Sequence, residues 1–300
     1  MDQSKHLGSM AIIREAIYLP TKNKKLMLSA FLLCFVPSSL LLTGNSISIY
    51  PLLLNLLTKL YLISRETPNT PQFFNAIIGL RDDADAFVRV YMILVVASYV
   101  VSTTSTIVMV HSSLLVYSGK HAGLSDVFSK VKSTWLRVFT TCIYSSMLYM
   151  GYTALSVGMI AVPLLRASGA IESIVLGGLL ALLARLLLVY LTMEWMVGVV
   201  VSVAEENCYG LEALRRGGET VKGKRLQGFI IALVMFFAEG ILSGGYGVLR
   251  AKNAMSFIVM GFLIVLMKLF SHLVYSLFYC ECRKEAAYTR VLSTPAEMLP

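Results

Sequence analysis

The sequence predicts an all-α fold, a polytopic membrane bundle of six transmembrane helices, and two observations support this. Apolar residues make up 57% of the chain and charged residues only 14%, whereas ordinary globular domains carry about 25% charged residues. The apolar residues are also gathered into long stretches, and a helix needs about 20 of them to cross the hydrocarbon core. Too little polar surface remains to cover a water-soluble protein, so most of the chain must face lipid or other helices.

The elements follow in a simple order. Residues 1–25 are polar and basic, with apolar residues at helical spacing, which predicts a short cytosolic amphipathic helix ending near Pro20. A six-span membrane domain over 26–281 and a cytosolic tail over 282–300 come next. The predicted spans lie at about 26–44, 88–118, 134–165, 173–204, 226–249 and 255–281.

The apolar segment 47–63 raises the question of a seventh span. With six spans, most Lys and Arg residues outside the spans lie on the side of the N-terminus, whereas a seventh span would divide them almost evenly. Positive charge concentrates on the cytosolic side of membrane proteins. We therefore expect six spans with both termini in the cytosol. Residues 45–87 then form a lumenal or extracellular loop, in which 47–63 is interfacial or re-entrant.

A weak internal repeat supports this plan. The tripeptides at 6–8, 121–123 and 208–210 read His-Leu-Gly, His-Ala-Gly and Cys-Tyr-Gly, and each precedes an amphipathic segment and a long span. We interpret the chain as three units, each a cytosolic interfacial helix followed by a hairpin of two spans.

The net charge of +9 favours lipid as a partner rather than nucleic acid. The basic residues form short clusters beside apolar spans, as in proteins that contact anionic headgroups of the cytosolic leaflet. We expect membrane lipids as partners, with other membrane proteins as further candidates and no nucleic acid. The candidate headgroup contacts are Lys130, Lys132, Arg215, Arg216, Lys222, Lys224 and Arg225.

Four charged residues lie inside predicted spans, where each costs at least about 2.5–3.5 kcal/mol. They are Arg185, Glu194, Glu239 and Lys268. Counting residues from the cytosolic ends places Glu239 and Lys268 at similar depth, so the sequence predicts an ion pair between them, with Glu194 as the second candidate partner. Arg185 lies nearer the other leaflet and is expected to extend toward the interface. These charges indicate either a structural ion pair or a polar transport site, and no further polar cluster is evident around them.

The five cysteines predict neither a disulfide framework nor a metal site. Cys208, Cys280 and Cys282 lie beside basic residues at span ends and are candidate palmitoylation sites. No nucleophile–base pair or cofactor motif is present in the sequence, so we expect no catalytic residues, no cofactor and no enzyme activity.

Several short motifs resemble a known family. They are Glu194-Trp195, the run from Val199 to Glu205, Ala213-Leu214-Arg215-Arg216, and the aromatic–Cys–basic end from Phe278 to Lys284. The chain resembles plant six-span transmembrane proteins of unknown function that are related to the membrane domain of bacterial glycerophosphodiester phosphodiesterases. The soluble phosphodiesterase is a separate domain in that family and is absent here, so the resemblance implies a fold and not hydrolysis.

These observations lead to two functional hypotheses. The first is a non-enzymatic integral membrane protein of the endoplasmic reticulum, secretory pathway or plasma membrane, which organises lipids or partner proteins through its cytosolic helices. The alternative is a transporter of a small solute or lipid that uses the intramembrane charges. A water-filled cavity reaching Glu194, Glu239 and Lys268 would favour transport, and a dry ion pair would favour the first hypothesis.

Overall fold

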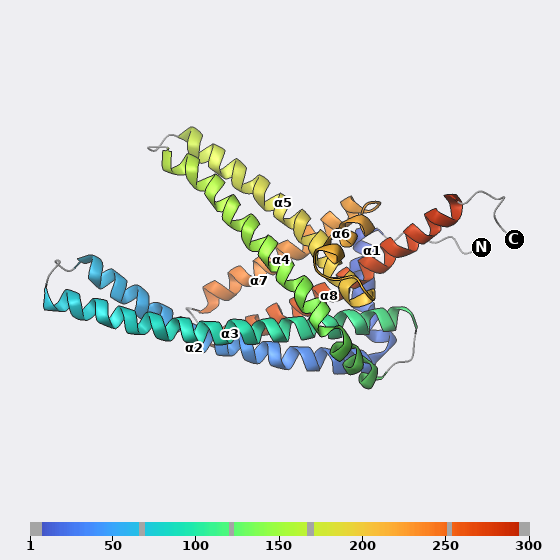
Figure 1. Cartoon of the computed structure of the whole chain (residues 1–300), viewed down its shortest axis with the longest axis horizontal. Coiled ribbons are helices and arrows are strands. Elements are labelled where there is room, and N and C mark those ends of the chain that lie inside the picture. The colour runs from blue at the N-terminus through green and yellow to red at the C-terminus, as the bar shows by residue number, and fades with distance from the viewer. Residues whose placement is uncertain (1–7, 66–69, 120–122, 167–170, 251–253, 294–300) are drawn as a thin grey trace.

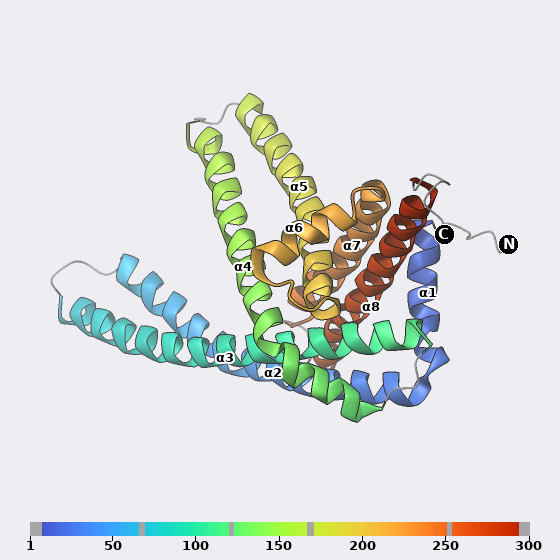
Figure 2. The same cartoon turned by 45° about the vertical axis from the view of Figure 1, so that its right-hand side comes forward.

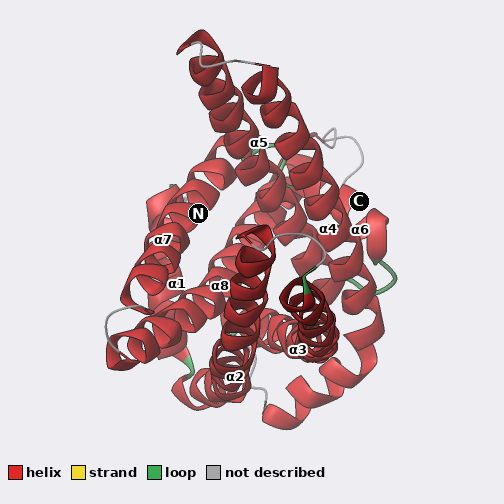
Figure 3. Ribbon diagram, turned by 90° about the vertical axis from the view of Figure 1, so that its left-hand side faces the viewer, coloured by secondary structure: helices red, strands yellow, loops and turns green. Residues whose placement is uncertain are grey.

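A computed structural model describes residues 8–65, 70–119, 123–166, 171–250 and 254–293 (Figure 1). Within these ranges the chain forms helices and no strands (Figure 3), so the all-α prediction is confirmed. The helices are α1 (Ser9–Lys22), α2 (Lys24–Arg65), α3 (Pro71–Tyr117), α4 (Leu124–Arg166), α5 (Ile171–Ala204), α6 (Gly210–Thr220), α7 (Arg225–Arg250) and α8 (Ala254–Ser293).

Six of these helices are long and apolar enough to cross a membrane, namely α2, α3, α4, α5, α7 and α8. This number confirms the six predicted spans. The chain is an integral membrane protein, since six helices of this length and apolar composition are typical of membrane spans. The short helices α1 and α6 are amphipathic. In α6, Ala213 and Gly217 are buried, whereas Arg215 and Arg216 on the opposite face are exposed.

The predicted loop 45–87 is helical over 45–65 and 71–87, and its placement on the lumenal side stays a prediction. Helix α2 continues without a break through Pro37 and Pro51 to Arg65, and α3 begins at Pro71. An interior proline removes one backbone hydrogen bond, and here the surrounding leucine-rich sequence stays helical. The segment 47–63 is helical as expected, but it prolongs the first span instead of forming a separate helix.

The prolonged parts of α2 and α3 are held together by polar contacts as well as by packing. The Lys59 ammonium lies 2.7 Å from the Asp83 carboxylate and donates a hydrogen bond to the Gly79 carbonyl at 2.8 Å. Thr70 caps α3, since its hydroxyl accepts a hydrogen bond from the Phe73 amide. Asp83, which lies within the predicted loop, is therefore part of a helical hairpin.

The hairpins α2–α3 and α4–α5 diverge from a common base, and α7 and α8 pack between them near that base (Figures 1 and 2). The central element is α8, which contacts α1, α2, α3, α5, α6 and α7. Its middle part is almost entirely buried, including Val274, Tyr275, Phe278 and Tyr279. The spans α2, α3, α5 and α7 therefore pack around α8.

Helix α1 precedes the first hairpin and α6 precedes α7, in agreement with the repeat plan. Before the second hairpin, the amphipathic segment 124–133 is the first part of α4 and not a separate helix. The threefold repeat and the cytosolic placement of these segments stay predictions.

Candidate functional site

A cavity of about 700 Å³ lies among the spans, and α3, α4, α5, α7 and α8 all contribute to its walls. Binding pockets for small molecules typically measure about 300–1,000 Å³. Three of the four predicted intramembrane charges reach this cavity.

Those three residues are Arg185 of α5, Glu239 of α7 and Lys268 of α8. Counting residues from the helix ends therefore correctly predicted that Glu239 and Lys268 lie near each other, and both line this cavity. The predicted ion pair itself is wrong, since no ion pair within 4.0 Å joins these two residues in the described structure. Both side chains are exposed and line the cavity, so each can meet water or a ligand there.

Arg185 lies over the ring of Phe236 on α7, with its guanidinium carbon 5.0 Å from the ring centroid. Both residues line the cavity. Stacking of this kind holds a guanidinium in place while leaving its donors free. The contact with Phe236 joins Arg185 to a neighbouring helix, and its extension toward the membrane interface stays a prediction.

Glu194 lies outside the cavity lining and takes no part in a pair with Lys268. Its carboxylate accepts a hydrogen bond from the Tyr190 hydroxyl at 2.7 Å and lies 3.9 Å from the Arg225 guanidinium. Arg225 is the first residue of α7, and Gly218 of α6 is also close to the Glu194 carboxylate. The fourth charge thus belongs to the junction of α5, α6 and α7.

Hydroxyl groups surround the three charges, contrary to the expectation that no polar cluster accompanies them. They come from Tyr99, Ser102, Thr103, Thr106, Ser145, Ser146, Tyr149, Thr192, Ser243, Ser271 and Tyr275. The hydroxyl-rich run 102–106 in the middle of an apolar span was a usable signal in the sequence. His272 also lines the cavity, with its Nε2 atom 3.5 Å from the Thr106 hydroxyl.

The surroundings of Gly240 and Gly244 also differ from what their spacing in the sequence predicts. Their small-xxx-small spacing is typical of close helix packing, yet nothing lies within 4 Å of a Cβ built on either residue. Gly240 lines the cavity instead. Close packing occurs elsewhere, between Gly198 of α5 and Gly217 of α6.

The basic residues predicted to bind lipid headgroups lie at the base, around α6 and the first turns of α4 and α7. Five of them pair with carboxylates: Lys130 with Glu206, Arg215 with Glu219, Arg216 with Glu205, Lys224 with Glu285 and Arg225 with Glu194. Lys224 is also buried, at 6% exposure. Within the described residues, the exposed Lys132 and Lys222 make no ion pair. These two are the lysines of the predicted set that the protein leaves available.

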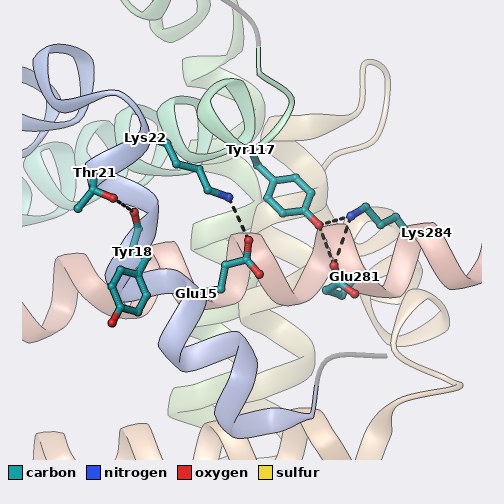
Figure 4. A network of polar contacts seen from close by, with 7 residues as sticks. All are labelled: Glu15, Tyr18, Thr21, Lys22, Tyr117, Glu281 and Lys284. Carbon is teal, nitrogen blue, oxygen red and sulfur yellow. Dashed lines mark hydrogen bonds and ion pairs between the residues drawn. The ribbon is translucent and has the colours of Figure 1, made fainter. Parts of the chain in front are cut away.

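A network of polar contacts joins the end of α3 to α8 (Figure 4). The Tyr117 hydroxyl donates to the Glu281 carboxylate at 2.7 Å, and the Lys284 ammonium donates to the same hydroxyl and lies 3.5 Å from the carboxylate. Nearby, Lys22 pairs with Glu15 of α1 at 3.1 Å. The first set of contacts joins the end of α3 to α8, and the Lys22–Glu15 pair lies within α1.

The three candidate acylation sites differ in accessibility. Cys208 and Cys282 are buried, at 1% and 3% exposure, and Cys280 is half-buried. Burial raises the pKa of the Cys208 thiol, and the nearby Arg216 opposes this effect only in part. Of the three thiols, Cys280 is the one that the fold presents best to a modifying enzyme.

The described residues contain no group of three or more His, Cys, Asp or Glu side chains that could hold a metal ion. The fold and its cavity define a polytopic all-α membrane protein with charged and hydroxyl groups gathered among its spans.

Comparison with known families places the chain more narrowly. Residues 1–287 match the family described as "Domain of unknown function (DUF8558)", so the chain belongs to this family. No curated protein and no solved structure matches the chain. The resemblance to plant six-span proteins stays a prediction.

Proposed function

We propose that this protein binds a small amphipathic anion in the intramembrane cavity and transports it across or within the membrane. This is the second of the two hypotheses drawn from the sequence. One observation carries it: Arg185, Glu239 and Lys268, from three different helices, line one cavity without pairing with one another.

The energetic argument favours a site over a structural lock. An ionisable group at depth costs at least about 2.5–3.5 kcal/mol, and it persists where it faces a partner or a polar cavity. A lock would place the opposite charges in contact and exclude water. Here Glu239 and Lys268 instead face a space of about 700 Å³, which has room for a ligand.

The lining indicates the chemical class of that ligand. Two cations, Arg185 and Lys268, outnumber the single carboxylate of Glu239, so the charge of the cavity favours an anion. Hydroxyl groups supply hydrogen-bond donors around them. Leu188, Met235 and other apolar side chains complete the wall. A carboxylate or phosphate headgroup with a short apolar chain satisfies all three kinds of lining.

The test uses the purified protein in nanodiscs made of zwitterionic lipid. Decanoate and decyl phosphate should raise the melting temperature and bind saturably, whereas decanol and decyltrimethylammonium should not. Arg185→Met and Lys268→Met should each weaken binding about tenfold or more, as expected for loss of a charge-assisted contact. Lys132→Met is the matched control, because Lys132 is exposed outside the cavity.

Transport is tested separately, as uptake of radiolabelled decanoate into proteoliposomes. Wild-type uptake that exceeds empty liposomes and is lost in Lys268→Met supports the proposal. Equal binding of decanol and decanoate, or full binding by both cavity variants, would overturn it.

The first hypothesis, organisation of lipids or partner proteins, remains the second candidate. It is favoured by the exposed Lys132 and Lys222 and by the apolar Tyr209 and Leu211, which are 53% and 55% exposed at the start of α6. We propose that this basic end faces the cytosol of the secretory pathway or plasma membrane. Protease protection of epitopes inserted after residue 222 in sealed microsomes would contradict that orientation.

A further inference from the structure

A second cavity, of about 200 Å³, lies between α2, α3 and α8. Ser102, Lys268 and His272 line both this cavity and the larger one, so the two spaces adjoin at these side chains. A single water needs about 10–15 Å³ of such volume. The smaller cavity therefore has room for a monovalent ion together with several waters.

The polar lining of the smaller cavity consists of hydrogen-bond donors and one cation. Its polar residues are Ser38, Asn45, Ser98, Ser102, Ser105, Lys268 and His272. No carboxylate is among the described residues that line it, in contrast to the larger cavity with Glu239. A space with an ammonium group, several neutral donors and no acidic residue is electrostatically suited to an anion.

Three of the neutral donors are not engaged within the protein. Several hydroxyls on the spans donate back to a carbonyl four residues earlier, as Ser38 does to Cys34 at 2.7 Å. The side chains of Asn45, Ser98 and Ser102 make no hydrogen bond within the described part of the chain, although they line the cavity. Polar groups in a membrane interior need partners, so these donors require water or a ligand.

Lys268 has the same requirement for its charge. Its ammonium makes no ion pair with any described carboxylate, and a lone cation is costly at this depth. We propose that the smaller cavity is a binding site for a small inorganic anion such as chloride. Lys268 supplies the charge, and Asn45, Ser98 and Ser102 donate hydrogen bonds. The inference goes beyond the proposed function. Both use Lys268, but Asn45 and Ser98 lie outside the larger cavity and distinguish the two sites.

The experiment compares sodium chloride with sodium gluconate at constant ionic strength, using the full chain in nanodiscs of zwitterionic lipid. Chloride should raise the melting temperature along a saturable curve, and radiolabelled chloride should bind with the same midpoint. Gluconate is too large and too hydrated for the cavity and should do neither. Identical melting curves in the two salts, with no bound chloride, would overturn the proposal.

Variants separate the two cavities. Ser98→Ala and Asn45→Ala should each weaken chloride binding by roughly twofold to tenfold, the effect of one lost hydrogen bond. Ser145→Ala and Ser243→Ala are matched controls, since both residues line only the larger cavity. Lys268→Met should abolish chloride binding and Lys268→Arg should retain it. If Lys268→Met does not fold, the comparison of Ser98→Ala with Ser145→Ala still tests the proposal.

A lipid headgroup is the competing source of an anion, and a final arm distinguishes it. The melting curves are repeated in chloride-free nanodiscs that contain phosphatidylglycerol. A stabilisation by this lipid that Ser98→Ala removes, without any response to chloride, would assign the cavity to lipid and overturn the inference. Equal loss of chloride binding in Ser98→Ala and Ser145→Ala would also overturn it.

Discussion

Gly217 of α6 lies directly against Gly198 of α5. A Cβ atom on Gly217 would come within 2.5 Å of the Gly198 nitrogen, and a Cβ on Gly198 would come within 2.7 Å of the Leu214 Cα. The obstacles are backbone atoms, which cannot rotate away. This contact holds the short amphipathic helix α6 on the end of α5, and the lack of side chains at both positions is what permits it.

Gly217→Ala should therefore separate α6 from α5 and lower stability by about 1–3 kcal/mol, the usual cost of overpacking. Gly218→Ala is the matched control, because its Cβ would meet the Glu194 carboxylate at an ordinary 3.6 Å. The control should be neutral or slightly stabilising, since alanine favours helix more than glycine does. Thermal unfolding in detergent measures both variants, and a Gly217→Ala protein as stable as Gly218→Ala would refute the close-packing argument.

The double-mutant cycle on Glu239 and Lys268 should give a small coupling. Breaking a contacting buried pair typically costs about 3–5 kcal/mol, and replacing both partners recovers much of it. These two residues share a cavity without forming an ion pair, so the coupling between Glu239→Leu and Lys268→Met should stay below the about 3–5 kcal/mol of a contacting pair. Chemical unfolding of the two single variants and the double variant provides the measurement. If the double variant recovers most of the lost stability, Glu239 and Lys268 form an ion pair in the membrane.

Lys224 should matter for folding and Lys222 for lipid contact, although they are two residues apart. The Lys224 side chain is 5% exposed and lies 2.8 Å from Glu285. Lys224→Met leaves that carboxylate without its cation and should cost about 1–3 kcal/mol. Lys222→Met should leave stability unchanged, and like Lys132→Met it should weaken binding to anionic vesicles by about 1 kcal/mol. Unfolding curves and vesicle titrations on both variants are needed, and a reversal of the two roles would contradict the structure.

Cys208 should react slowly with maleimide at neutral pH. Its thiol is buried, and burial raises its pKa, so the reactive thiolate is scarce at pH 7 and increases as the pH rises. Because Cys208 is buried and Cys280 is half-buried, a variant that retains only Cys208 should label more slowly than one that retains only Cys280. The labelling rate of Cys208 should rise toward higher pH. Arg216→Ala removes the neighbouring cation that favours the thiolate and should slow labelling further. Faster labelling of Cys208 than of Cys280 would exclude the buried position.

Acylation follows the same order of accessibility. If the chain is palmitoylated, Cys280 should be the principal site, because Cys208 and Cys282 are closed by the fold. Acyl-biotin exchange on Cys280→Ser, with Cys282→Ser as the matched control, measures the difference. Unchanged acylation in Cys280→Ser would show that a buried cysteine, Cys208 or Cys282, becomes accessible in cells.

The sequence by itself determined the number and the order of the spans. Apolar length is a local property, and a run such as 173–204 must be helical in lipid whatever surrounds it, since its backbone can be satisfied only internally. Depth is also local, because each helical residue adds about 1.5 Å. Counting along α7 and α8 therefore brought Glu239 and Lys268 to the same cavity.

Only the tertiary structure decided which faces of the helices meet. In a span, the face toward lipid and the face toward another helix are both apolar, so hydrophobicity does not distinguish them. For this reason the glycine spacing at Gly240 pointed to packing where there is a cavity. The lysine and carboxylate at equal depth likewise pointed to an ion pair, but both residues line that cavity. The continuation of α2 beyond residue 44 likewise depends on α3, whose Asp83 and Gly79 carbonyl hold Lys59 from a distant part of the chain.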